Sequence, residues 1–357
     1  MEPRRKTRRI NVGNVSVGAD APISVQSMTN TNTADAIATV AQINALAVAG
    51  CEIVRVAVPD LEAAKALKRI KDGINIPLIA DVHFDWRLAI AALEAGVDGL
   101  RLNPGNIGDE DRIKAVVAEA SARRVPIRIG VNAGSVEKDI LARYGHPTKE
   151  ALVESALRHV HILEDMGFFD IKISIKASSV PLTIESYTLL SGKVDYPLHV
   201  GVTEAGTLFS GAIKSAVGIG TLLARGIGDT LRVSITGDPV DEVRVGWQIL
   251  KSLELRRRGV NVISCPTCGR IKFDCAAVAT EVEKRLSYVT EPVNVAIMGC
   301  VVNGPGEARE ADVGIAGGDG NGLIYLKGEV LRKVAEKDMV DALVEEVEAF
   351  IERKKRR

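Results

Sequence analysis

Three cysteines in the C-terminal third of the chain have the type and spacing of metal ligands. Cys265 and Cys268 form a C-x-x-C pair, and Cys300 follows in the glycine-rich segment 298–307. Such a pair serves in redox disulfides, zinc sites and iron–sulfur sites. No second C-x-x-C and no pair of histidines follows to complete a tetrahedral zinc site, which makes zinc the weaker interpretation. Three thiolates in a glycine-rich setting instead predict a cubane iron–sulfur cluster.

A fourth ligand for this cluster has three candidate sources, namely Cys275, Glu307 and the substrate. Cys275 lies within an apolar helical pattern, where a thiol packs like a small hydrophobic side chain, so we interpret it as a core residue. Glu307 follows the Gly-Pro-Gly turn at 304–306 and could reach the metal. A carboxylate is a harder ligand than a thiolate and can yield to a substrate oxygen, which would leave one iron for chemistry.

A second group of polar and charged side chains recurs where predicted strands end. In a parallel barrel, catalytic groups project from the C-terminal ends of the strands. A single arginine there ordinarily pairs with a helix carboxylate, but several cations in one mouth repel one another unless an anion binds. The planar fork of arginine suits phosphate oxygens, so the pattern predicts a diphosphate site. The residues at these ends are Arg55, Asp81, His83, Arg101, Asn103, Arg128, Asn132, Ser174, Lys176, Glu204, Arg232 and Ser234.

Two carboxylates in this group have more than one interpretation. Alternation along the predicted strand 197–204 places Glu204 on the outer face unless the strand bends or ends early. General acid/base catalysis and a structural ion pair are equally open for it. Asp81 is expected to hold His83 or a substrate hydroxyl, or to cap a helix. The remaining buried-pattern histidines, His159 and His199, are interpreted as ordinary structural residues.

The elements that must position these groups repeat eight times from residue 21 onward. In each cycle an apolar, β-rich run precedes a helical pattern, and glycines at 50, 96, 167 and 226 mark helix ends. Eight cycles predict a (β/α)8 TIM barrel; a doubly wound sheet is the alternative, but no G-x-G-x-x-G follows the first strand. The predicted strands span 22–28, 52–58, 77–84, 98–103, 126–132, 170–176, 197–204 and 230–236, and the helices span 33–49, 61–71, 86–95, 109–123, 149–166, 184–190, 209–224 and 239–255.

A different pattern begins after the eighth helix and contains four of the five cysteines. We therefore predict a barrel domain over residues 1–258 and a small α/β iron–sulfur domain over 259–357. A domain of about 95 residues often needs a metal or a partner to complete its stability. Its predicted strands span 260–264, 293–298 and 323–327, and its predicted helices span 275–286 and 337–354.

Composition limits the classes of partner and the cellular location. The 357 residues include 46 acidic and 46 basic side chains, so no global field attracts nucleic acid or a membrane surface. No apolar run approaches the roughly 18 residues of a membrane span, and the first residues have no apolar core for secretion. These features predict a cytoplasmic protein. Five cysteines, an odd number in a chain of this size, favour ligation or catalysis over disulfides.

Two motifs give the chain a specific resemblance. Cys-Pro-Thr-Cys-Gly-Arg at 265–270 and Met-Gly-Cys-Val-Val-Asn-Gly-Pro-Gly-Glu-Ala at 298–308 closely resemble the 4-hydroxy-3-methylbut-2-enyl diphosphate synthase family, in its short bacterial two-domain form. The resemblance runs from about residue 6 to the final helix. Barrel segments similar to the family's signatures are 26–29, 55–59, 101–106, 128–132, 174–176 and 203–206.

The resemblance implies an activity, a cofactor and a set of site residues. The activity is the two-electron reductive opening and dehydration of 2-C-methyl-D-erythritol 2,4-cyclodiphosphate to 4-hydroxy-3-methylbut-2-enyl diphosphate, in isoprenoid precursor synthesis. The cofactor is a 4Fe-4S cluster, whose ligands in the family match Cys265, Cys268, Cys300 and Glu307. Glu204 matches the family's barrel glutamate and is expected to handle a proton. Residues expected to contact the substrate are Arg55, His83, Arg101, Arg128, Asn132, Lys176, Ser234 and Asn303.

The resemblance also implies partners. Reduced flavodoxin or ferredoxin would supply electrons singly, and a homodimer would place the barrel of one chain opposite the cluster domain of the other. Cys275 has no counterpart in the family pattern. The competing interpretation is a zinc-stabilised barrel that binds phosphorylated ligands or pterins, as dihydropteroate synthases do, without redox activity.

Overall fold

The computed structural model describes residues 1–300, 302 and 304–356 and divides into two compact units. The first unit spans Met1–Arg256 and the second spans Arg257–Arg357. Each unit has its own hydrophobic core, and each is described separately below.

The first unit is a parallel barrel of eight strands, as the repeating pattern predicted. The strands follow one another around the barrel in chain order, and the last of them pairs with the first. A parallel bridge between Ile173 and Leu198 joins the remaining two edges and completes the ring. The strands are β3 (Ser24–Met28), β4 (Ile53–Ala57), β5 (Leu78–Asp81), β6 (Gly99–Arg101), β7 (Ile127–Asn132), β8 (Ile171–Lys176), β9 (His199–Val200) and β10 (Thr230–Leu231).

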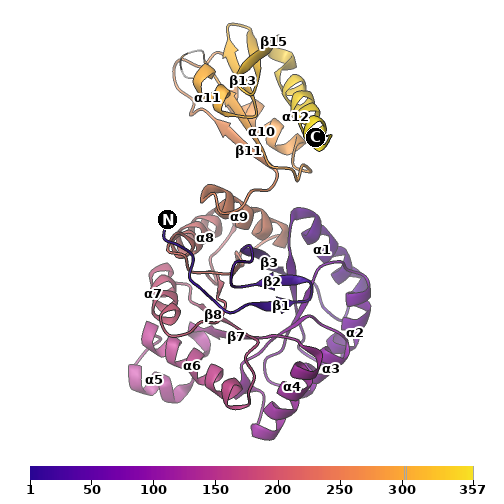
Figure 1. Cartoon of the computed structure of the whole chain (residues 1–357), viewed down its shortest axis with the longest axis vertical. Helices are drawn as coiled ribbons and strands as arrows, with labels where there is room; N and C mark the ends of the chain where they lie inside the picture. The colour runs from indigo at the N-terminus through magenta and orange to yellow at the C-terminus, as the bar shows by residue number, and fades with distance from the viewer. Residues whose placement is uncertain (301, 303, 357) are drawn as a thin grey trace. The chain divides into compact units, whose positions relative to one another are not determined.

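Helices surround this barrel and cover the outer face of its strands (Figure 1). The predicted glycine stops are confirmed, since Gly50, Gly96, Gly167 and Gly226 all have positive φ angles, from 71° to 105°. The short helix α5, which was not predicted, precedes α6. The helices are α1 (Ala36–Ala49), α2 (Leu61–Asp72), α3 (Trp86–Glu94), α4 (Glu110–Arg123), α5 (Lys138–Tyr144), α6 (Lys149–Asp165), α7 (Val180–Ser191), α8 (Leu208–Ala224) and α9 (Pro239–Ser252).

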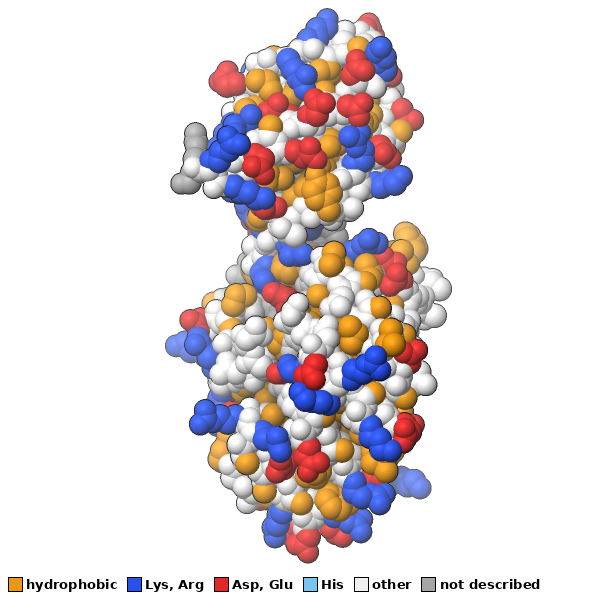
Figure 2. Space-filling view, turned by 90° about the vertical axis from the view of Figure 1, so that its right-hand side faces the viewer, with side chains coloured by type: hydrophobic (Ala, Val, Ile, Leu, Met, Phe, Trp, Pro, Cys, Tyr) orange, Lys and Arg blue, Asp and Glu red, His pale blue; other side chains and the backbone are white. Residues whose placement is uncertain are grey.

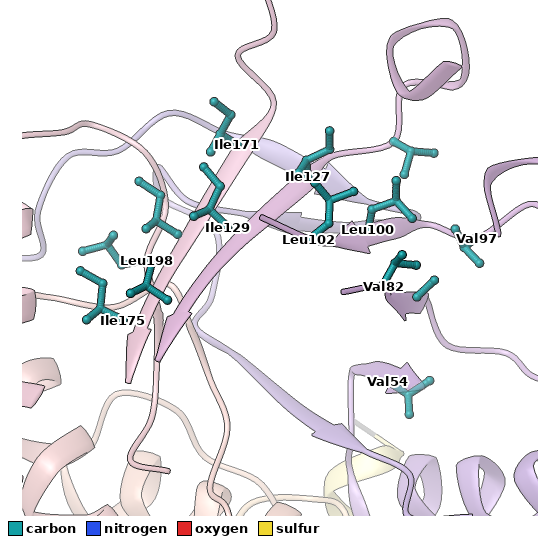
Figure 3. Close-up of a cluster of buried hydrophobic side chains, with 14 of the residues drawn as sticks. Val54, Val82, Val97, Leu100, Leu102, Ile127, Ile129, Ile171, Ile175 and Leu198 are labelled. Carbon is teal, nitrogen blue, oxygen red and sulfur yellow. The ribbon is translucent and has the colours of Figure 1, made fainter. Parts of the chain in front are cut away.

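The barrel core separates apolar from polar side chains by strand face. Residues such as Val54, Leu100 and Ile127 are fully buried and belong to one continuous cluster (Figure 3). Alternate residues on the barrel strands, among them Arg128 and Lys172, are also buried but charged. The apolar face packs under the helices, so the charged face lines the inside of the barrel. This polar lining is unusual for a barrel interior, which branched aliphatic side chains ordinarily fill.

A hairpin of β1 (Ile10–Val12) and β2 (Val15–Val17) covers the N-terminal end of the barrel. Its apolar residues pack against Ile53 and Ile79, which stand near the beginnings of their strands. The preceding arm is tied down by Arg4, whose Nη2 lies 2.7 Å from the carboxylate of the buried Asp229. One end of the barrel is therefore sealed, and only the C-terminal ends of the strands remain for a site.

Four predicted strands end earlier than expected, which places four candidate residues beyond strand ends. β5 ends at Asp81 instead of 84 and β6 ends at Arg101 instead of 103, so His83 and Asn103 follow these strands. β9 ends at Val200 instead of 204, and β10 ends at Leu231 instead of 236. Val202 and Val233 are fully buried beyond these ends, so the apolar pattern continues where the ladder of hydrogen bonds has stopped. Glu204 and Ser234 consequently lie in segments that follow strands.

The second unit is a five-stranded mixed sheet with helices, in the order β11-β12-β13-β14-β15. Its first two strands match the predicted ranges, whereas two of the five strands and one helix were not predicted. Its core includes Val295, Ile315 and Leu343. The elements are β11 (Val260–Ser264), α10 (Cys275–Arg285), β12 (Val293–Met298), α11 (Gly304–Glu310), β13 (Val313–Gly318), β14 (Asn321–Leu326), β15 (Glu329–Ala335) and α12 (Met339–Lys355).

The molecular surface carries both signs of charge. Basic and acidic side chains are interspersed on the face drawn in Figure 2, in keeping with a formal net charge of zero. Among the described residues, no helix has the length and apolar character needed to cross a membrane.

Candidate active site

Asp81 connects two arginines and a histidine at the ends of neighbouring strands. Its carboxylate lies 3.1 Å from Nη1 of Arg101, 3.5 Å from Nε of Arg55 and 3.5 Å from Nε2 of His83. Burial alone would raise the pKa of Asp81, but the charges of Arg55 and Arg101 lower it to about 2. Asp81 therefore lies beside His83 and pairs with two guanidinium groups that were not expected as its partners, while Nη1 of Arg101 lies closer to His83, at 2.8 Å from its Nε2.

The Arg101 guanidinium passes over a glycine that leaves space for it. A Cβ atom at Gly130 would stand 2.5 Å from Nε of Arg101, so a larger residue would displace the side chain. Nη2 of Arg101 donates to the Gly130 carbonyl at 2.8 Å, and Asn103 also donates to this carbonyl while accepting from the Gly130 N–H. Arg101 is thus held on both sides.

Arg128 and Lys176 are buried cations on the next two strands. Arg128 is 2% exposed, and among the described residues its Nε and Nη1 have no hydrogen-bond partner. Burial, together with the nearby charges of Arg55 and Arg101, lowers the pKa of Arg128 well below its ordinary value. Burial and the charge of Arg232 do the same to the pKa of Lys176. Such unmet donors are costly inside a protein and indicate a position for an anion.

Lys172 extends this group of cations deeper into the barrel and was missed from the sequence. It is the Cα partner of Arg128 across β7 and β8, is 2% exposed, and its Nζ has no hydrogen-bond partner among the described residues. Burial, followed by the charge of Arg128, lowers the pKa of Lys172 to about 7. The signal was present, because Lys172, Ser174 and Lys176 alternate on one face.

Arg232 and Glu242 were also not assigned together from the sequence. Nη2 of Arg232 lies 2.9 Å from the Glu242 carboxylate, which is 4% exposed. Glu242 further accepts hydrogen bonds from the Ser27 hydroxyl at 2.9 Å and the Ile235 N–H at 3.1 Å. Glu242 is therefore a second buried anion beside Asp81. It lies on α9, where a sequence reading expects an ordinary helix residue.

The remaining predicted barrel residues lie at the margin of this group. Asn132 is half-buried and pairs in register with Lys176, and Ser234 is half-buried beyond β10. Glu204 is exposed and has a φ angle of 54°, a left-handed conformation uncommon for glutamate. The contacts that gather the arginines around Asp81 do not include these three residues.

The two histidines interpreted as structural are both buried. His159 lies 3.1 Å from the Glu137 carboxylate on the helical side of the barrel. Nδ1 of His199 lies 2.7 Å from the Thr230 hydroxyl inside the barrel. Burial and the charge of Lys176 lower the pKa of His199 well below its ordinary value, so it is neutral.

In the second unit, topology brings the thiol motifs to one edge of the sheet. β11 and β12 are parallel neighbours, and Cys265 and Cys300 lie just beyond their ends. The Gly299 N–H donates to Sγ of Cys265 at 3.2 Å. Backbone donation to cysteine sulfur is one of the contacts that tune iron–sulfur ligands, so this chemistry fits such a cluster.

The individual ligands at this edge differ in exposure. Cys265 and Cys300 are half-buried, whereas Cys268 and Glu307 are exposed. Within the described ranges, no group of three or more His, Cys, Asp or Glu side chains is arranged to hold a metal ion. Cys275 is 2% exposed at the start of α10, as expected of a core residue. Asn303 lies outside the described residues.

The barrel can bind a strongly anionic ligand, and the second unit presents soft thiol ligands. At the barrel mouth, charge repulsion among buried cations would be relieved by a diphosphate, whose oxygens match arginine donors. This chemistry agrees with the resemblance noted in the sequence.

Comparison with known proteins identifies the family. The sequence profile of the GcpE TIM-barrel domain matches residues 7–247, and that of the GcpE protein C-terminal domain matches 261–349. A relative from Geobacter sulfurreducens, named 4-hydroxy-3-methylbut-2-en-1-yl diphosphate synthase (flavodoxin), is 66% identical over 98% of this chain and 99% of its own length. A Clostridium perfringens protein of the same name is 58% identical over 97% of this chain and 99% of its own.

Solved structures give a much weaker likeness. Dihydropteroate synthase from Xanthomonas albilineans has a TM-score of 0.48 and 14% identity, covering 70% of this chain and 99% of its own. Two domain profiles and relatives of nearly equal length establish that this chain belongs to the GcpE family, whose similar members are named 4-hydroxy-3-methylbut-2-en-1-yl diphosphate synthases.

Proposed function

We propose that this chain catalyses the reductive ring opening and dehydration of 2-C-methyl-D-erythritol 2,4-cyclodiphosphate, which yields 4-hydroxy-3-methylbut-2-enyl diphosphate. The observation that carries the proposal is the group of buried cations around Asp81, with donors that no protein acceptor satisfies among the described residues. Relatives at 58–66% identity, named for the same diphosphate product, support it.

The diphosphate of the substrate lies among the cations at the barrel mouth. Arg55, Arg128 and Lys176 neutralise its charge, while Arg101 is held in place by Asp81 and Gly130. Ring opening breaks a carbon–oxygen bond to phosphate and adds negative charge to the departing oxygen. Buried cations stabilise this developing charge more strongly than water does. The remaining substrate contacts are proposed for His83, Asn132, Ser234 and Asn303.

The second unit is proposed to hold a 4Fe-4S cluster on Cys265, Cys268, Cys300 and Glu307. Thiolates are the preferred protein ligands for such clusters, and Glu307 is the ligand that can be exchanged. When bound, the cluster supplies the two electrons that the reaction consumes, one at a time. The Gly299 N–H donates to Sγ of Cys265 at 3.2 Å and would orient that sulfur as a ligand.

Glu204 is proposed to transfer a proton during loss of water. It is exposed at the C-terminal end of the barrel and has a φ angle of 54°; such strained positions concentrate at functional sites. Glu204→Gln keeps the shape of the side chain and removes its acid–base function, whereas Glu204→Gly relieves the backbone strain. If neither substitution changes anaerobic turnover, Glu204 has no part in the mechanism.

Partner proteins follow from the names of the relatives and from one surface feature. The relatives are named for flavodoxin, so reduced flavodoxin is the proposed electron donor, with ferredoxin as the alternative. A homodimer is proposed in which the barrel of one chain works with the cluster domain of the other. Helix α8 supports self-association, because Phe209, Ile213 and Val217 form an exposed apolar stripe at helical spacing.

An anaerobic assay of the full-length chain tests the proposal. The protein is purified without oxygen, its metals are measured, and the cyclic diphosphate is supplied with a chemical one-electron reductant. We expect roughly four irons per chain and product formation that depends on the reductant. Colourless protein with zinc, no iron and no product would instead support the phosphate- or pterin-binding alternative.

A further inference from the structure

A buried histidine of the barrel contacts two loops that follow neighbouring strands. His159 lies on α6, is 2% exposed, and its Nδ1 accepts a hydrogen bond from the Gly105 N–H at 3.3 Å. Its other ring nitrogen, Nε2, lies 3.1 Å from the Glu137 carboxylate. Gly105 belongs to the short 3-10 helix Pro104–Asn106 (the 104–106 turn) that follows β6, and Glu137 follows β7 and directly precedes α5. The proposed mechanism gives this imidazole no role.

The two contacts define the tautomer of the His159 ring. A backbone N–H can only donate, so Nδ1 carries a lone pair and the ring proton is on Nε2, which faces Glu137. Both Glu137 oxygens are buried and make no hydrogen bond of normal geometry among the described residues, so the contact with Nε2 is electrostatic. Burial alone would raise the pKa of Glu137, but the interaction with His159 lowers it to about 2, which keeps the carboxylate ionised.

Close packing fixes the distance between the His159 ring and the 104–106 turn. A Cβ atom at Gly105 would stand 3.0 Å from Cε1 and 3.3 Å from Nδ1 of His159, so a larger residue would push the turn away from the ring. Helix α5 has a separate attachment to α6, because the Arg158 guanidinium donates to both oxygens of Asp139, at 2.9 and 2.6 Å. The contact of His159 with the turn therefore does more than join these two helices.

Asn103 connects the 104–106 turn to the guanidinium of Arg101. It directly precedes the turn, and its backbone carbonyl accepts the Asn106 N–H at 2.9 Å. Its side chain accepts the Gly130 N–H at 2.9 Å and donates to the Gly130 carbonyl at 3.1 Å. Nη2 of Arg101 donates to the same carbonyl at 2.8 Å. A displacement of the turn would therefore reach the arginine through Asn103 and Gly130.

We propose that His159 and Glu137 are positioning residues for the diphosphate of the substrate. Through the 104–106 turn and Asn103 they hold the Arg101 guanidinium where it contacts the phosphate oxygens. Neither side chain touches the substrate, and neither transfers a proton to it. The effect on the substrate rests on the function proposed above, whereas the tautomer of His159 and its contact with the turn do not.

The competing interpretation is that the pair only stabilises the packing of α5 and α6, and paired variants separate the two. His159→Phe removes both ring nitrogens, whereas His159→Asn keeps an acceptor near the Nδ1 position. Glu137→Leu removes the carboxylate, whereas Glu137→Gln keeps an oxygen that can face Nε2. His161→Phe, at an exposed position of the same helix, is the control.

Anaerobic kinetics of the full-length protein, with iron content and circular dichroism measured for each variant, give the first test. We expect KM for the cyclic diphosphate to rise roughly tenfold in His159→Phe and about fivefold in Glu137→Leu, with kcat within about twofold, because Arg101 is no longer held. His159→Asn, Glu137→Gln and His161→Phe should keep KM within about threefold of wild type. If His159→Phe lowers stability but leaves KM unchanged, or if His159→Asn is no better than His159→Phe, the pair is only structural and the proposal is wrong.

Nitrogen NMR of the histidine rings gives a second test that does not depend on activity. The chain has five histidines, and the signal that disappears in His159→Asn belongs to His159. We expect its proton on Nε2 and none on Nδ1, and we expect hydrogen exchange of the Gly105 amide to accelerate in His159→Phe. A proton on Nδ1, or an unchanged exchange rate, would overturn the proposal. If both expectations hold but the wild type neither binds nor converts the cyclic diphosphate, the proposed function fails, while the contact between His159 and the turn stands.

Discussion

The barrel mouth and the thiol-bearing edge of the second unit are built in opposite ways. At the mouth, Arg101 and Arg128 stand on strands and are at most 5% exposed, and Arg101 is held by a carboxylate and a backbone carbonyl. At the edge, Cys268 and Glu307 are exposed and lie beyond the strands, in a loop and in the short helix α11. The fold fixes the charged groups of the barrel mouth, whereas the proposed ligands of the second unit lie on segments that connect its strands.

This difference indicates what positions the functional side chains in each region. The cations of the mouth are positioned by β-sheet register and by close packing around Gly130, so they are preorganised for an anion. Ligands on loops gain their order from the metal, because metal binding and folding of such sites are coupled. We therefore expect the two regions to respond differently to the same kind of disturbance.

Removal of metal should give the largest effect on turnover and little effect on the barrel. Chelation of the full-length protein is expected to abolish product formation, because the proposed cluster would supply the electrons for the reaction. Binding of the cyclic diphosphate, measured by calorimetry under anaerobic conditions, should persist within a few-fold. Cys300→Ser is expected to behave in the same way.

The matched control for metal removal is the protein reconstituted with iron and sulfide, which should recover turnover. Loss of diphosphate binding together with the metal would contradict the independence of the two regions. That result would mean that the positions of the cations at the barrel mouth depend on the second unit.

Arg128→Met should give the next largest effect. A buried cation that contacts an anionic substrate contributes about 3 kcal/mol to binding, so affinity for the diphosphate should fall by roughly a hundredfold. The iron content should not change. The free energy of unfolding should remain equal or rise, because a buried guanidinium with unmet donors is replaced by an apolar chain. Affinity is measured by calorimetry and stability by urea unfolding.

Arg112→Met is the control for this substitution, since Arg112 is exposed on α4. A large loss of stability in Arg128→Met, with unchanged affinity in the protein that remains folded, would show that Arg128 is structural. The mouth would then not be a preformed anion site.

Much of the fold was predictable because its signals are local. Apolar runs, helical periodicity and glycine stops such as Gly96 gave the eight cycles, and each stop has the left-handed φ angle that a helix end needs. Strand ends were less predictable. Val202 is buried beyond β9, so the apolar pattern gave no sign that pairing had ended. β15 was missed because its residues are mostly exposed and lack apolar alternation.

The site was predictable only where residue type alone carries the chemistry. Arginines at strand ends indicated an anion site, but the partnership of Arg232 with Glu242 depends on how α9 packs against the barrel. Donation from the Gly299 N–H to Sγ of Cys265 likewise arises from the pairing of β11 with β12. No residue spacing in a single sequence indicates either of these contacts.

Gly130→Ala should have a moderate effect that is confined to the mouth. The added Cβ would stand 2.5 Å from Nε of Arg101, so the guanidinium must move. The φ angle of Gly130 is not in the positive range, so alanine causes no backbone strain there. We expect KM for the cyclic diphosphate to rise roughly tenfold, equivalent to about 1.4 kcal/mol, with a smaller change in kcat.

Gly134→Ala is the control, because a Cβ at Gly134 would meet no atom within 4 Å apart from its own chain neighbours. An unchanged KM in Gly130→Ala would mean that Arg101 tolerates displacement. Its fixed position would then not contribute to binding.

Lys172→Met should have the smallest effect on turnover and a pH-dependent effect on stability. Burial, then the charge of Arg128, lowers the pKa of Lys172 to about 7, whereas the unfolded chain has a lysine pKa of about 10.4. Between these values the unfolded chain binds more protons, so wild-type stability rises with pH. Lys172 therefore opposes folding most at pH 7 and below. The variant should be more stable than wild type there, by at most about 5 kcal/mol, and the difference should shrink as the pH approaches 10.

Urea unfolding of both proteins between pH 6 and 9 measures this difference, with the exposed Lys193→Met as the control. A constant difference across this range would mean that Lys172 does not titrate inside the barrel. A large loss of diphosphate affinity would instead place Lys172 among the substrate-binding cations. The preformed anion site would then extend along β8 from Lys176 at the strand end to Lys172 inside the barrel. Such a site, built on a strand, would differ still more from the ligands that lie on loops.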